Sequence, residues 1–205
     1  MQPSRLFLMA WLLVAVTACA SADVQPAAQP QPQAAVVLSQ QAMEAFALAQ
    51  SNDPFQQELG FLRLEALREP ATVSLIRPYA DHRDPDLRAY AVRALAAVQG
   101  PEAVPLLLQK LKTDRSARVR GAAILGMEPY QSSSPMMLPA LLKALRDRSP
   151  EVRITAIDVV SRIHDPRARE AILLRNKREH HQDVRRALGV AVPRVLGSHA
   201  STPSR

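Results

Sequence analysis

The chain has 205 residues, of which 47% are hydrophobic and 22% are charged, so it suits one domain or a short repeat array and is not wholly disordered. With 4% aromatic residues and only 6 glycines it is unlike a β-sandwich or barrel, and its abundance of Ala, Leu and Arg favours helices. The single Cys excludes an intramolecular disulfide framework and a Cys-rich zinc site, and the net charge of +7 favours anionic partners.

Residues 1–18 have the features of a secretion signal peptide. Arg5 precedes an apolar run, Leu6 to Val16, that is shorter than the roughly 20 residues a membrane-spanning helix needs. The run ends in Val16-Thr17-Ala18-Cys19, which resembles the lipobox of bacterial lipoproteins. The resemblance implies cleavage before Cys19 and acylation of that Cys by fatty acids such as palmitate. Because Ala20 rather than Asp follows, it also implies sorting to the outer membrane, facing the periplasm. The alternative is an ordinary signal peptide with an incidental Cys.

Residues 19–41 are predicted to be the acylated Cys and a flexible tether. The segment is rich in Gln, Pro and Ala, and Pro26, Pro30 and Pro32 favour extended polyproline-type backbone. About 20 such residues reach at most roughly 60 Å, which separates a folded body from the lipid surface.

An internal repeat covers the following part of the chain. Four segments, which begin at His82, Asp114, Asp147 and Glu179, align without gaps, and each carries an aliphatic residue followed by Arg. The aliphatic residues are spaced by 32, 33 and 32 positions; they are Leu87, Val119, Val152 and Val184. Small or aliphatic residues recur three, four and seven positions after each Arg, which places them on one helical face. The pattern predicts one amphipathic helix per repeat.

A second helix is predicted in each of the first three repeats. These helices begin near Pro101, Pro135 and Pro166, where a first-turn proline is tolerated because its missing amide has no helical partner. Two helices in 32–33 residues leave only short loops, so they must be antiparallel neighbours. The predicted fold is therefore all-α.

The repeats resemble HEAT repeats of the bacterial kind, whose signature is D-x-x-P-x-V-R-x-x-A. The stretch from Asp147 to Ala156 matches it at every stated position, and the preceding repeat departs only by Ala117 in place of Pro. The resemblance covers residues 81–196 and implies a right-handed α-solenoid whose second helices line the concave side. It also implies a ladder of ion pairs within and between repeats: Asp114 with Arg120, Asp147 with Arg153, Asp81 or Asp84 with Arg88, and Glu179 with Arg185. An unrelated helical bundle, and arginines that contact a ligand, are the alternatives.

Both ends of the array are expected to be atypical. Residues 42–80 are predicted to form capping helices and a degenerate hairpin, because each repeat leaves an apolar face that a terminal cap must cover. The last helix, about residues 181–196, has no second helix after it, and residues 197–205 are predicted to be a disordered tail.

No catalytic, cofactor or metal site is expected. The chain contains no nucleotide-binding glycine motif and no G-x-S-x-G motif. His180, His181 and Asp183 form the only cluster of potential ligands, but two adjacent His residues do not share a helical face. Cys19 is assigned to lipidation, so a Cys-based mechanism is not expected either.

The positive charge suggests an anionic partner in the envelope: lipid headgroups, lipopolysaccharide phosphates or an acidic protein. Export argues against nucleic acid, and a merely solvated basic surface is the alternative. We expect a lipid-anchored, non-catalytic scaffold that binds another cell-envelope protein through its second helices. The candidate contacts are Gln109, Lys110, Lys112, Lys143, Arg146, Arg175 and Lys177. A periplasmic chaperone or assembly factor akin to a pilotin, acting through the last helix, is one alternative. A bilin-lyase-like enzyme subunit is another, because similar short HEAT repeats occur in phycobilin lyases.

Overall fold

The computed structural model of the chain describes residues 38–130 and 135–197. All of them belong to the unit formed by residues 36–205. The predicted signal peptide, Cys19, most of the tether and nearly all of the predicted tail lie outside the described residues.

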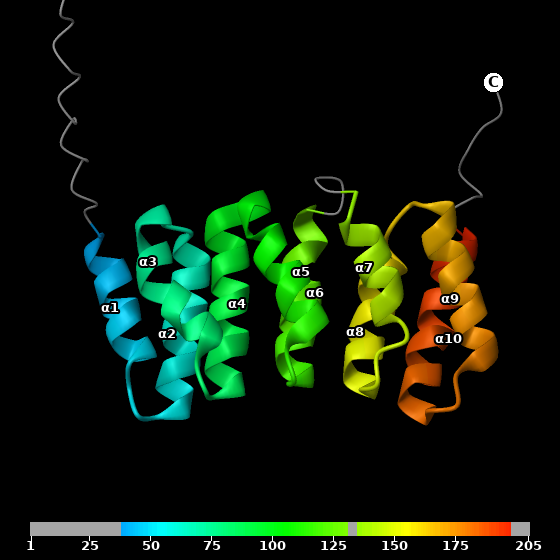
Figure 1. The fold of residues 1–205 in the computed structure, drawn as a ribbon, viewed down its shortest axis with the longest axis horizontal. Helices are drawn as coiled ribbons and strands as arrows, with labels where there is room; N and C mark the ends of the chain where they lie inside the picture. Colours follow the sequence, from blue (N-terminus) through cyan, green and yellow to red (C-terminus); the bar gives the residue numbers. More distant parts are fainter. Residues whose placement is uncertain (1–37, 131–134, 198–205) are drawn as a thin grey trace, which may run out of the picture. The chain divides into compact units, whose positions relative to one another are not determined.

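The described residues form helices joined by short turns, with no β-strand among them (Figure 1). Within these residues there are ten α-helices and four short 3-10 segments, η1 (Pro70–Thr72), η2 (Arg77–Asp81), η3 (Gly100–Ala103) and η4 (Glu128–Tyr130). The helices are α1 (Gln40–Ala49), α2 (Pro54–Leu67), α3 (Val73–Ile76), α4 (Pro85–Gln99), α5 (Val104–Thr113), α6 (Ala117–Met127), α7 (Met137–Ala144), α8 (Pro150–Val160), α9 (Pro166–Arg178) and α10 (Gln182–Gly197).

The helices pack in two rows. The first helices of the repeats, α4, α6, α8 and α10, contact one another in chain order, and α2 and then α1 extend this row toward the N-terminus. The second helices, α5, α7 and α9, form the other row. The predicted fold class, an α-solenoid of antiparallel hairpins, is confirmed.

Helix starts follow the signals in the sequence. The side chains of Asp84, Ser149 and Asp165 each accept a hydrogen bond from a backbone amide in the first turn of the next helix, and each is followed by a proline. Gly100 ends α4 with a φ of 63°, a conformation that a glycine adopts without strain.

The continuous stretch Pro85–Thr113 is long and apolar enough to span a membrane by length and composition alone, because an 18-residue window within it has a mean hydropathy of 1.2. In the structure it is not one straight helix, because it turns at Gly100 and runs back through the short segment η3 (Gly100–Ala103) into α5. It forms the first hairpin of the array, and the aliphatic residues that give it its hydropathy pack in the core.

The core follows the repeat. Leu87, Val119, Val152 and Val184 are all buried, and so are the residues four positions further on, Ala91, Ala123, Ala156 and Leu188. Small residues set the helix spacing where helices meet most closely. A Cβ atom added at Gly126 of α6 would lie 2.9 Å from the Cβ of Ala96 in α4. One added at Gly60 of α2 would lie 2.3 Å from the backbone nitrogen of Ala49 in α1.

The N-terminal hairpin differs from the others in its second half. Three short pieces, η1 (Pro70–Thr72), α3 and η2 (Arg77–Asp81), stand where the other hairpins have a single second helix, which agrees with the degenerate hairpin predicted for this part of the chain. Pro78 lacks the amide hydrogen that a continuous helix would use, which accounts for the break between α3 and η2. At the other end, α10 includes Gly197, one residue beyond its predicted limit, and runs through Pro193.

Candidate functional site

A ladder of arginine–carboxylate pairs links successive repeats. Arg88 reaches Asp114, with Nε 3.0 Å from Oδ2 and Nη2 3.0 Å from Oδ1. Arg120 reaches Asp147 in the same way, at 2.9 and 2.7 Å. Arg153 reaches Glu179 at 3.0 and 3.2 Å. Each pair joins a guanidinium and a carboxylate through two parallel hydrogen bonds, a geometry that orders both side chains.

The direction of the ladder corrects the prediction of ion pairs within repeats. Asp114 does not pair with Arg120, nor Asp147 with Arg153. Within a repeat, the third guanidinium nitrogen, Nη1, binds backbone carbonyls instead: Nη1 of Arg120 lies 3.1 Å from the oxygen of Asp114. The Asp114 carboxylate accepts from the Ser116 amide at 2.9 Å and faces the preceding repeat. Each arginine therefore closes its own loop and fixes the next repeat at the same time.

The last rung also differs from its prediction. Arg185 is exposed at the start of α10 and does not pair with Glu179. Two other arginines hold that carboxylate: Arg153 from the preceding repeat and Arg175, one turn earlier on α9.

The ladder keeps its carboxylates ionised. Burial of Glu179 acts to raise its pKa, but the His181 amide, Arg175 and Arg153 outweigh burial and lower the pKa to about 2. For Asp114 and Asp147 burial also acts upward, and hydrogen bonds from Arg88 and Arg120 respectively bring each pKa below its usual value. These charges are satisfied within the protein, so the ladder is structural.

Next to the ladder lies a groove of about 790 Å³ between α5 and α7. Its apolar lining is formed by Leu108, Leu111, Met136, Ala140 and Ala144. Five exposed cations also line it: Lys112, Arg115, Lys143, Arg146 and Arg148. Its two carboxylates, Asp114 and Asp147, are already paired in the ladder. We call this feature the α5–α7 groove.

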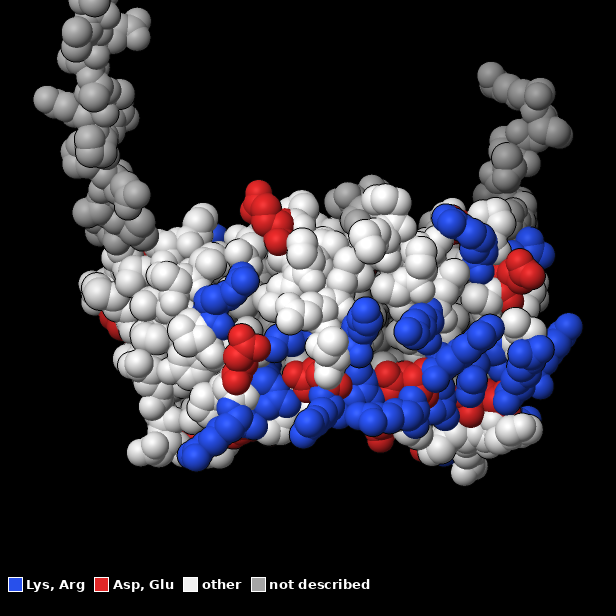
Figure 2. Space-filling model, viewed as in Figure 1, with Lys and Arg blue, Asp and Glu red and all other residues white. Residues whose placement is uncertain are grey.

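Figure 2 shows the wider setting of this groove. Lysine and arginine side chains form a band across the lower part of the face, with acidic atoms visible between them. A smaller hollow of about 320 Å³ between α7 and α9 continues the band and is lined by Arg146, Arg167 and Arg178, together with Glu170. Positive charge therefore extends along the second helices.

Comparison with known proteins identifies the family. The family model described as HEAT repeats matches residues 45–128 and 104–192. The chain belongs to the HEAT-repeat family. The predicted resemblance is thereby confirmed, and the ladder and paired helices are the structural form of its repeat.

Two solved structures are similar to this HEAT-repeat protein. One is the complex of CpcE and CpcF of phycocyanin lyase from Nostoc sp. PCC7120; it is 23% identical, has a TM-score of 0.62, and the match covers 73% of this chain and 96% of that one. The other is a designed armadillo repeat protein in complex with the peptide (KR)4; it is 13% identical, has a TM-score of 0.49, and the match covers 74% of this chain and 80% of that one. The search of curated proteins gave no match.

The HEAT-repeat structure separates the seven predicted contacts into two groups. Five side chains are exposed on the second helices: Gln109, Lys112, Lys143, Arg146 and Lys177. Lys110 is 6% exposed, and its Nζ lies 2.5 Å from the Ala80 carbonyl oxygen and 2.7 Å from Asp81 Oδ1. Arg175 pairs with Glu179. These two predicted contacts thus already have partners inside the array, unlike the other five.

Two cations of the α5–α7 groove were not among the predicted contacts. Arg115 and Arg148 each follow a ladder aspartate directly, and Nη2 of Arg148 lies 3.0 Å from the Arg115 carbonyl oxygen. Their shared place in the repeat was a signal that could have identified them. Arg83 occupies the same place in the first repeat, so this exposed column of cations recurs along the array.

The described part of the chain contains no group of three or more His, Cys, Asp or Glu residues placed to hold a metal ion. His181 and Asp183 approach only to 4.0 Å at the start of α10. The second helices present lysine and arginine side chains, which are charged hydrogen-bond donors, beside an apolar surface. This arrangement suits the binding of anionic groups.

Proposed function

We propose that this protein is a non-catalytic HEAT-repeat scaffold that binds another protein of the cell envelope through its second helices. In the proposal a lipid anchor at Cys19 holds it at the outer membrane, on the periplasmic side. The α5–α7 groove is the observation that carries the proposal, since it combines an apolar lining with five exposed cations.

The ladder supports a binding role because it makes the surface rigid. Three bidentate ion pairs join the successive repeats, and the core runs unbroken from α4 to α10. A face that is already ordered loses little conformational freedom on association, so more of the contact energy is available as affinity.

The anchor and tether support the same role in a different way. Several acyl chains on one Cys are sufficient for stable membrane attachment. A scaffold confined to the membrane meets membrane-associated partners at a raised effective concentration, without additional contacts.

Site-specific photo-crosslinking in cells tests the binding face. A photoreactive amino acid at Gln109 or Lys177, both exposed on second helices, is expected to capture a discrete envelope protein. The control position is Leu125 on α6, which is 44% exposed in the row of first helices. Equal capture from Leu125, or no capture from any position, would contradict the proposed face.

The anchor is tested separately. Cys19→Ser is expected to abolish labelling by palmitate and to release the protein from the membrane fraction. Retention of Cys19→Ser with membranes would contradict lipid anchoring. The purified protein is expected to be colourless, and visible absorbance from a bound bilin would contradict a non-catalytic scaffold.

One observation favours a second candidate, a chaperone or assembly factor that uses the last helix. Val190 and Leu196 of α10 are 64% and 48% exposed, so the last helix presents two aliphatic side chains to solvent. Capture of an apolar client from a photoreactive residue at Val190, but not from Gln109, would favour this function over the scaffold.

A further inference from the structure

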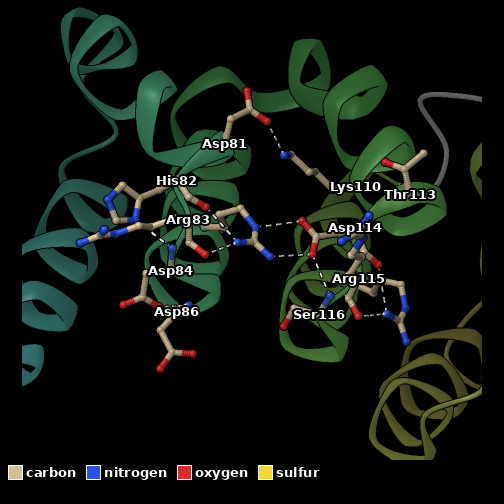
Figure 3. Close-up of polar contacts among 12 residues, drawn as sticks. Asp81, His82, Arg83, Asp84, Asp86, Lys110, Thr113, Asp114, Arg115 and Ser116 are labelled. Carbon is tan, nitrogen blue, oxygen red and sulfur yellow. Dashed lines mark hydrogen bonds and ion pairs between the residues drawn. The ribbon is translucent and has the colours of Figure 1, made fainter.

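The second helices carry a cation at one repeated position. The cation lies four residues before the ladder carboxylate that begins the next repeat, and it is Lys110, Lys143 or Arg175. In the first hairpin this cation is neutralised by the preceding repeat, where Asp81 lies 2.7 Å from Lys110 Nζ (Figure 3). At Lys110 the repeated cation is therefore paired, and the carboxylate comes from the preceding repeat across the boundary between the two repeats.

The next boundary lacks that carboxylate. Asp81 directly precedes the start of its repeat motif at His82, and the residue in the same place before Asp114 is Thr113. The Thr113 hydroxyl donates 2.9 Å to the Gln109 carbonyl of its own helix. Lys143 is exposed and forms no ion pair within residues 38–130 and 135–197.

At the third inter-repeat boundary the cation is paired with a carboxylate that follows it on the same chain segment. The place of Asp81 is taken there by Arg146, which would repel a cation, and Arg175 pairs instead with Glu179 on its own chain segment. Of the three equivalent cations, Lys143 is thus the one that the described protein leaves without a carboxylate, and it lines the α5–α7 groove.

We infer that the α5–α7 groove binds an acidic polypeptide segment of the partner, with one carboxylate beside Lys143 where the array supplies none. This inference rests on the proposed function, because it names the chemistry of the segment that the scaffold recognises. The bound carboxylate takes the role at Lys143 that Asp81 has at Lys110.

The surroundings of Lys143 specify more than a single anion. The same groove is lined by three exposed arginines, Arg115, Arg146 and Arg148. These guanidinium groups can pair with several carboxylates spaced along one bound peptide. Leu108, Leu111 and Met136 provide an apolar lining that an inorganic anion would leave uncovered. The volume of about 790 Å³ lies in the range of roughly 300–1,000 Å³ typical of ligand sites. A hollow of this kind fits an acidic segment with apolar side chains better than it fits a flat lipid surface.

Peptide binding to the full-length chain in detergent tests the inference. The probes are fluorescein-labelled peptides of repeated Glu-Leu, Glu-Ser and Lys-Leu, compared by fluorescence anisotropy. Glu-Leu is expected to bind most tightly and to weaken as salt screens the charges, Glu-Ser to bind more weakly, and Lys-Leu not to bind. Equal binding of Glu-Leu and Lys-Leu would overturn the inference.

Thr113 offers a variant that restores the missing charge within the chain. Thr113→Asp places a carboxylate at the position of Asp81 and is expected to weaken Glu-Leu binding roughly threefold or more, as an internal competitor for Lys143. Thr113→Asn, which has the same shape without the charge, is the matched control and is expected to bind as the wild type does. Lys143→Gln is expected to weaken binding to a similar extent. Unchanged affinity in both Thr113→Asp and Lys143→Gln would overturn the site.

Vesicles of phosphatidylglycerol address the competing ligand class. The unacylated Cys19→Ser chain is used for this test. If it binds these vesicles, loses that binding when Lys143 is replaced, and does not bind the Glu-Leu peptide, the groove recognises a lipid surface and the peptide assignment is overturned. Crosslinking from Gln109 and Lys177 separates this inference from the proposed function. If a protein is captured there but Glu-Leu peptides do not bind, the inference fails and the scaffold proposal stands; if neither occurs, both fail.

Discussion

Arg153 and Glu179 form the most deeply buried pair of the ladder, with Nε 3.0 Å from Oε2 and side chains that are 11% and 3% exposed. Arg175 binds the same carboxylate from α9. One acidic side chain therefore joins the third hairpin to the start of α10, and its ionisation matters for the stability of the C-terminal part of the array.

Acid should weaken this junction in a defined pH range. The pKa of Glu179 is lowered from 4.5 to about 2, so its contribution is complete above pH 4.5 and is lost as the pH falls toward 2. Glu179→Gln is expected to reduce the free energy of unfolding at pH 7 by on the order of 2–3 kcal/mol, and the difference from wild type should shrink below pH 4.5. Urea unfolding followed by circular dichroism at pH 7, 4.5 and 2.5 measures it. A difference that is the same at all three pH values would contradict this account.

The middle rung should behave as a coupled pair. Arg120 is 4% exposed, so Asp147→Ala leaves a buried guanidinium without its carboxylate and is expected to cost about 3 kcal/mol of unfolding free energy. A double-mutant cycle with Arg120→Met should give a coupling of roughly 1–3 kcal/mol, because the second change removes the unpaired charge.

The exposed pair of Arg167 with Asp165 is the control for that cycle. Arg167 is 67% exposed, and Arg167→Ala should leave the free energy of unfolding unchanged within error. Additive effects in the Arg120 and Asp147 cycle would show that the rung does not act as a unit.

Two glycines should respond in opposite ways to the same substitution. In Gly60→Ala the new Cβ would meet backbone atoms of α1, 2.3 Å from the Ala49 nitrogen and 2.7 Å from the Ala45 oxygen, so α1 must move away from α2. We expect a loss of at least about 2 kcal/mol. Gly189→Ala has nothing within 4 Å and should stabilise α10 by up to about 1 kcal/mol, since alanine favours a helix. Thermal unfolding of both variants measures the contrast, and a stable Gly60→Ala protein would contradict the close packing of α1 on α2.

Lys110 should stabilise the array through a carbonyl more than through its ion pair. Its Nζ is bound to the Ala80 oxygen inside the protein, whereas its partner Asp81 is 84% exposed. Lys110→Met keeps the apolar stem but leaves the carbonyl without a donor, and it should cost about 1–3 kcal/mol. Asp81→Asn should leave stability unchanged within error. A larger loss in Asp81→Asn than in Lys110→Met, measured by urea unfolding, would reverse this assignment.

The repeat period predicted most of the fold. The spacing of Leu87, Val119, Val152 and Val184 located the buried face of each first helix, and the prolines located the helix starts. It could not predict the direction of the ladder. Arg120 has an aspartate six residues before it and another 27 residues after it, and an aligned column is compatible with either partner. The choice depends on how the helix start orients the guanidinium, which is a property of the packed hairpins.

The candidate site was less predictable for a related reason. Lys110 and Lys143 occupy the same column, and a sequence pattern assigns them the same role. In the structure Lys110 is buried and is bound to the Ala80 carbonyl and to Asp81 in the preceding loop, whereas Lys143 is exposed and Thr113 stands in the place of Asp81. Comparing the loops at equivalent positions, in addition to the helices, would have separated the two lysines.

Each ladder arginine pairs with the carboxylate that begins the next repeat, so whole repeats can be removed or added without breaking the pattern of pairs. Excision of residues 115–147, one full period, would join Asp114 directly to Arg148. Arg88 would still face Asp114, and Arg153 would still face Glu179, so no ladder charge would lose its counter-ion. Duplication of the same block would add a rung by the same rule. Genetic gain or loss of whole periods can thus change how many binding modules the protein displays while its electrostatic framework stays complete.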